Sequence, residues 1–91
     1  MTIQEIKYYQ ARYLVLVNQL VRLNRILETN KRAGAKLYMT NPGDPAYQEN
    51  KNLRNRIFCL KADTYVLFVV VACMKDDQGE YINNAKYGRI E

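Results

Sequence analysis

The sequence predicts an all-α protein, an antiparallel helical hairpin with helices over about residues 3–33 and 45–76 that assembles into a bundle. Three observations carry this prediction: two segments of similar length each show an apolar stripe, and a single Pro- and Gly-rich turn separates them. Residues that recur at alternating spacings of three and four lie along one stripe of an α-helix. Two such helices joined by one short connection pack side by side in opposite directions.

The first helix is predicted from the N-terminal third of the chain. Thr2 can act as its N-cap, with Glu5 three positions later completing a capping box. Lys31 and Arg32 in a last turn, followed by Gly34, indicate where this helix stops. The stripe consists of Ile6, Tyr9, Tyr13, Leu16, Leu20, Leu23 and Leu27.

The second helix is predicted to begin directly after the turn over residues 40–45. Asp44 is suited to the N-cap, and Pro45 to the first helical position, where its missing N–H costs nothing. The run over residues 76–79 ends the pattern. The second stripe consists of Leu53, Ile57, Leu60, Thr64, Leu67, Val71 and Met74.

One segment favours a different fold. Residues 64–71 are rich in β-branched and aromatic types, so propensity alone predicts a strand over residues 64–74 and an α+β fold. A lone two-stranded hairpin is marginal in water, and the stripe continues through the segment, so the helix is preferred. Residues 1–79 then form a single helical-hairpin domain, and residues 80–91 form a polar C-terminal tail.

Two helices alone cannot enclose a core, because each hides only one stripe. The first helix carries an apolar shoulder beside its stripe, and the second is apolar on every side over residues 65–74. Self-association into a four-helix homodimer would bury both surfaces. The residues expected at this oligomer interface are Leu14, Val17, Val21, Phe68 and Val70.

Charge is concentrated near the turn. The chain has 14 Lys and Arg against 9 Asp and Glu, a net charge of +5. Residues 22–61 hold nine basic and three acidic residues, which makes this half the basic end of the hairpin. Its cations suit an acidic protein surface or nucleic-acid phosphates. The residues predicted to bind a partner or phosphate are Arg22, Arg25, Arg32, Lys36, Lys51, Arg54 and Arg56.

Catalysis is not expected. The chain has no His, which removes the usual general base and the commonest metal ligand, and its nine acidic residues are scattered. We therefore expect no catalytic residues, no metal site and no cofactor. No motif is specific enough to indicate a family. The expected function is that of a non-enzymatic interaction protein that self-associates and binds a larger macromolecule, as a small regulator or inhibitor would. The alternative is a basic nucleic-acid-binding dimer that contacts phosphates.

The expected location is the cytoplasm, with no membrane partner. Residues 1–5 lack the charged and apolar regions of a secretory signal peptide. The most apolar run, residues 65–74, is ten residues long, whereas a bilayer-spanning helix needs about 20. Cys59 and Cys73 lie 14 residues apart, too far along one helix for an internal disulfide, and are expected to be reduced packing residues.

Overall fold

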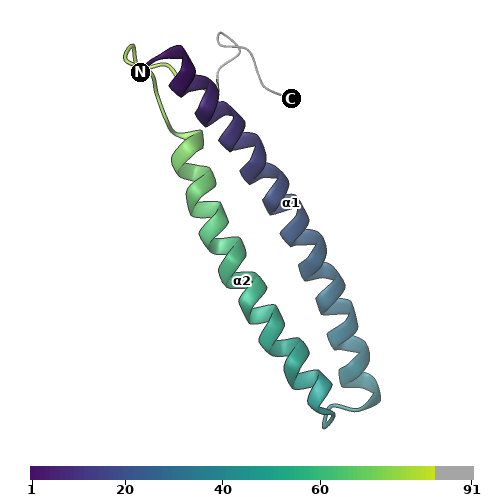
Figure 1. Cartoon of the computed structure of the whole chain (residues 1–91). Helices are drawn as coiled ribbons and strands as arrows, with labels where there is room; N and C mark the ends of the chain where they lie inside the picture. Colours follow the sequence, from purple (N-terminus) through teal and green to yellow (C-terminus); the bar gives the residue numbers. More distant parts are fainter. Residues whose placement is uncertain (84–91) are drawn as a thin grey trace.

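A computed structural model describes residues 1–83 and shows an antiparallel helical hairpin, which confirms the predicted all-α fold. Helix α1 spans Ile3–Thr40 and helix α2 spans Pro45–Ala72. The two helices run side by side over the length of α2, with the connecting turn at one end, and the N-terminal part of α1 extends beyond α2 (Figure 1). The molecule is 58 Å long and only 19 by 16 Å across.

Both helix starts were predicted correctly. The backbone N–H of Glu5 donates to the Thr2 hydroxyl at 3.1 Å, and the Glu5 carboxylate accepts from the Thr2 N–H at 3.2 Å, which completes the capping box. The hydrogen bond from the Thr2 backbone holds the pKa of Glu5 below its usual value. At the second start, the Asp44 carboxylate accepts from the Ala46 N–H at 2.9 Å, and Pro45 is the first helical residue.

The predicted end of the first helix was wrong by one heptad. Helix α1 continues through Gly34 to Thr40, and Gly34 is buried inside it. A Cβ atom built on Gly34 would lie 2.4 Å from the Arg54 guanidinium and 2.5 Å from the Asn50 side-chain oxygen. The glycine therefore allows α2 to approach α1 closely. The sequence alone could not distinguish this role of a glycine from that of ending a helix. The helix ends instead before Pro42, which cannot continue it.

The second helix ends at Ala72, four residues earlier than predicted. Residues 64–72 are helical, so the alternative strand over residues 64–74 is wrong. Beyond α2 the chain turns over residues 76–79, and Lys75 and Tyr81 form an isolated antiparallel bridge. Within residues 1–83 this bridge is the one instance of β-type pairing.

The chain after this turn packs on the N-terminal part of α1. Ile82 is fully buried, and its carbonyl accepts a hydrogen bond of 2.7 Å from the Gln10 side chain. The amino group of Met1 lies 2.7 Å from the Asp77 carboxylate, which raises the pKa of that amino group. Residues 80–83 of the predicted polar tail therefore have a defined place, and residues 84–91 lie outside the described residues.

We call the residues of each helix that pack against the other helix its seam. The seam of α1 follows the predicted stripe and extends it toward the turn. Ile6, Leu16 and Leu27 are buried, and the other members of the stripe are half-buried. Continuing the same alternation of three and four beyond Leu27 reaches Asn30 and then Gly34, and both are buried against α2. One polar and one glycine residue thus complete a seam that is otherwise apolar.

The seam of α2 is rotated relative to the predicted stripe. Ile57 and Val71 are buried as predicted, and Thr64 is half-buried. The three leucines predicted to share this seam are instead about half exposed: Leu53, Leu60 and Leu67. The positions just after them take their place, namely Arg54, Lys61 and Phe68, which are half-buried. Neighbouring residues on a helix differ by about 100°, so the leucines lie beside the seam and form a separate apolar row.

Candidate functional site

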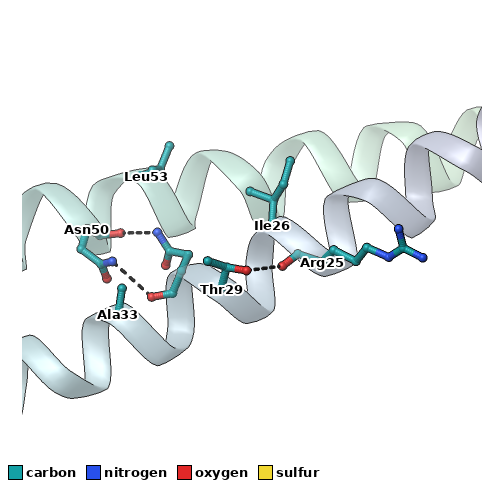
Figure 2. A pocket seen from close by; sticks show the side chains of 7 residues that line it. Arg25, Ile26, Thr29, Ala33, Asn50 and Leu53 are labelled. Carbon is teal, nitrogen blue, oxygen red and sulfur yellow. Dashed lines mark hydrogen bonds between the residues drawn. The ribbon is translucent and has the colours of Figure 1, made fainter.

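A polar cluster joins the two helices near the turn. The Asn30 side chain donates to the Asn50 carbonyl at 3.2 Å, and the Asn50 side chain donates to the Asn30 carbonyl at 3.1 Å. Arg54 donates from Nε to the Asn30 Oδ1 at 3.1 Å and from Nη2 to the Asn50 Oδ1 at 2.9 Å. Figure 2 shows the reciprocal hydrogen bonds of Asn50 across the seam. Two amides and one guanidinium thus bond to one another where Gly34 leaves α2 room to pack closely on α1.

This cluster gives Arg54 a structural position that the sequence did not indicate. Its guanidinium is half-buried and is bonded to neutral amides, with no carboxylate oxygen within 4.0 Å in residues 1–83. The hydrogen bonds between this charge and the two amides form only at one alignment of α1 and α2, so the cluster fixes the register of the helices. Polar residues at core positions of coiled coils act in the same way. Among the cations predicted to bind a partner, Arg54 is therefore the one engaged within the hairpin.

The other six predicted partner-binding cations are exposed on both helices: Arg22, Arg25, Arg32, Lys36, Lys51 and Arg56. None has a carboxylate oxygen within 4.0 Å among the described residues. By helical spacing, Arg25, Arg32 and Lys36 lie on the side of α1 that faces away from α2, whereas Lys51 and Arg56 lie on opposite flanks of α2. The charges surround the basic end and do not converge on one patch.

Aromatic side chains also gather at the basic end. The rings of Tyr38 and Tyr47 lie 5.8 Å apart across the turn, and Tyr38 is exposed. The Lys31 ammonium lies 5.8 Å from the centre of the Phe58 ring and 3.9 Å from the Glu28 carboxylate. Tyr38 therefore presents an exposed ring at the same end of the hairpin as the unpaired cations, and such a ring is suited to stacking on a base.

The residues predicted for the oligomer interface fall in three different places. Leu14, Val17 and Val21 share one flank of α1 by their spacing, the first two half-buried and Val21 exposed. Phe68 lies in the seam, where its ring packs 5.2 Å from that of Tyr13, in the other helix. Val70 is 58% exposed and lies on the far side of α2 from Phe68. The structure thus does not bring these five residues together.

A second apolar surface lies on the flank of the hairpin opposite to that of Leu14, Val17 and Val21. Leu53, Leu60 and Leu67 are 50%, 56% and 49% exposed, and we call this row the leucine flank. Leu53, at one end of the row, and Ile26 of α1 both line an open hollow between the helices (Figure 2). These leucines were recognised in the sequence as apolar at heptad spacing, but were assigned to the hairpin seam.

Both thiols are accessible. Cys59 and Cys73 are free and exposed, so they are not the buried packing residues that the sequence suggested. They form no internal disulfide, as expected.

The part of the chain that the structure describes offers no assembled metal centre. Within residues 1–83 no group of three or more Cys, Asp or Glu side chains is placed to hold a metal ion. No helix among these residues is long and apolar enough to cross a membrane. The fold and surfaces define a two-helix protein with apolar residues exposed on both flanks and cations around one end. No protein-family model, curated protein or solved structure matches this chain.

Proposed function

We propose that this chain is a non-enzymatic interaction protein that associates with a second copy of itself and binds a larger macromolecule through its basic end. The proposed self-association rests on the small number of apolar side chains that the hairpin buries compared with the number it leaves exposed. Among the described residues, six apolar side chains are buried, while 17 large hydrophobic side chains are exposed. A monomer rarely leaves so much apolar surface in water.

The elongated shape supports self-association. The radius of gyration is 18.6 Å, whereas a compact chain of this length has one of about 12 Å. Two helices packed side by side bury a single seam, and a second hairpin supplies the two further helices that a bundle core needs. We therefore propose a homodimer as the functional unit.

The unpaired cations support the second part of the proposal. Exposed Arg and Lys side chains without acidic neighbours raise the local concentration of anions and steer acidic partners toward the surface. A small regulator or inhibitor that docks on an acidic protein surface would use them in this way. We place the protein in the cytoplasm, where exposed thiols such as Cys59 and Cys73 stay reduced.

A direct nucleic-acid binder is the second candidate, and the exposed Tyr38 ring at the basic end favours it. Aromatic rings stack on bases of any sequence, and Arg and Lys contact the phosphates. A dimer would carry two such ends.

Solution mass measured by light scattering on gel filtration, with absorbance at 260 and 280 nm, tests both candidates. The expected result is a dimer of twice 10.7 kDa at both low and high salt, free of nucleic acid. Nucleic acid that elutes with the protein at low salt and is removed at high salt would establish the alternative, because counterion release makes phosphate binding steeply salt-dependent. A monomer under all conditions would contradict the self-association.

The basic end is tested by the double variant Arg25→Glu, Arg32→Glu. Both side chains are exposed and lie away from α2, so the hairpin should fold and dimerise as before. Binding to an acidic partner or to nucleic acid should weaken at least about tenfold, since opposite charges are replaced by like ones. Unchanged binding would mean that these cations belong to an ordinary solvated surface.

A further inference from the structure

We infer that the second copy docks on the leucine flank of α2, with α2 of one copy antiparallel to α2 of the other around a two-fold axis near Leu60. This inference rests on the proposed self-association and names its surface. It differs from the interface expected from the sequence, which drew on residues that the structure separates.

The spacing of the leucines fits a helix partner. Leu53, Leu60 and Leu67 recur every seven residues, so they line one side of α2 over about 21 Å. Each leucine remains about half exposed although α1 packs on α2, so the hairpin leaves the row without a complete packing partner. A two-fold axis through Leu60 places Leu60 against its own copy and Leu53 opposite Leu67 of the second copy.

Charges beside the leucine flank are self-complementary in this arrangement. Arg56 and Asp63 both lie within about 60° of Leu60 around the helix axis, four residues before it and three after it. The two-fold axis therefore sets Arg56 opposite Thr64 of the second copy, next to Asp63 of that copy. The symmetry repeats the pairing, so the interface contains two such Arg56–Asp63 pairs. Neither side chain has an ion-pair partner in the described part of the hairpin. A parallel two-fold arrangement would instead place Arg56 and Asp63 of the two copies on opposite sides of the interface, where they could not pair.

The opposite flank of α2 lacks this complementarity. The charged side chains of residues 45–72 that lie on or beside this flank are Lys51, Arg54 and Lys61, and all three are cations. Two copies meeting there would bring like charges together. Phe58 and Tyr65 also lie on this flank and are 47% and 57% exposed, so charge, and not apolar exposure, separates the two flanks. Of the two flanks, the leucine flank is therefore the one that fits a second copy.

Matched variants on the two flanks test the surface. Leu60→Glu should reduce the mass in solution from twice 10.7 kDa to 10.7 kDa, because it sets two carboxylates at the centre of the interface. Val21→Glu, which changes an exposed residue on the other flank of α1, should leave the dimer mass unchanged. If Val21→Glu dissociates the dimer and Leu60→Glu does not, the leucine flank is not the interface, although the proposed self-association remains correct. A monomeric wild-type protein would overturn both.

Charge exchange tests the antiparallel direction without touching an apolar side chain. Arg56→Asp or Asp63→Arg alone should raise the dimer dissociation constant by roughly 10- to 100-fold, because ion pairs become like-charge contacts. The double variant that exchanges the two residues should recover wild-type affinity. Arg32→Asp, on the outer side of α1, is the matched control and should have no effect. Single variants that dimerise as the wild type does would overturn the antiparallel arrangement.

Discussion

Leu16→Asp is expected to abolish cooperative unfolding. Leu16 is 1% exposed, at the middle of the seam of α1, and its side chain is among the most completely buried of the described residues. Removing a buried leucine costs about 2–5 kcal/mol. An unpaired carboxylate at the same place adds the cost of desolvating a charge. A small domain has only about 5–15 kcal/mol of stability in total, and a hairpin with six buried apolar side chains lies at the low end.

Thermal unfolding followed by circular dichroism, at one fixed protein concentration, measures this effect. The control is Val66→Asp, which places the same charge on an α2 residue that is 61% exposed and should shift the midpoint only slightly. If Leu16→Asp keeps the wild-type midpoint, the packing of α1 on α2 described above is incorrect.

Gly34→Ala is expected to destabilise the protein, although alanine is the better helix former by about 1 kcal/mol. The new Cβ would lie 2.4 Å from the Arg54 Nη2 atom and 2.5 Å from the Asn50 Oδ1 atom, so one or both must move. These two atoms are hydrogen-bonded to each other at 2.9 Å, and their displacement breaks the bonds that hold the polar cluster. Hydrogen bonds to charged groups contribute about 1.5–3 kcal/mol each. The net loss should be about 2 kcal/mol.

The melting midpoint should therefore fall by about 8–16 °C, given a shift of about 4–8 °C per kcal/mol in a domain of this size. Gly43→Ala provides the matched control. Its Cβ would meet only the Asn41 side chain, at an ordinary 3.6 Å, and the backbone there has no positive φ. We expect the midpoint of Gly43→Ala to stay the same or rise slightly. A rise with Gly34→Ala would mean that α2 can retreat from Gly34 without loss, and that the polar cluster does not set the register.

Much of the hairpin was predictable because local chemistry decides it. Both helix starts follow from short-range hydrogen bonds of Thr2, Glu5 and Asp44, and the turn follows from the inability of Pro42 to continue α1. The stripe of α1 was correct because its apolar residues recur without a break from Ile6 to Leu27, whereas the apolar shoulder beside it is short.

The surfaces of α2 were less predictable because this helix is apolar on several sides. Leu53, Leu60 and Leu67 fit the heptad spacing as well as the seam residues do, and the two rows share Ile57, Thr64 and Val71. A periodic pattern cannot choose between two rows that it fits equally well. Leu67, read from the sequence as a core residue, is 49% exposed, so its replacement by Asp should act on association and not on folding of the hairpin.

The sequence by itself therefore determined the two helices, their N-caps, their antiparallel direction and the basic end, since these depend on residues close together in the chain. Only the tertiary structure decided the rotation of α2. Arg54 and Asn50 can occupy its seam because Asn30 on α1 meets their hydrogen-bonding groups and Gly34 leaves room for them. That partnership joins residues 20 or more positions apart, and it turns the leucine flank outward, where it is available to a second copy.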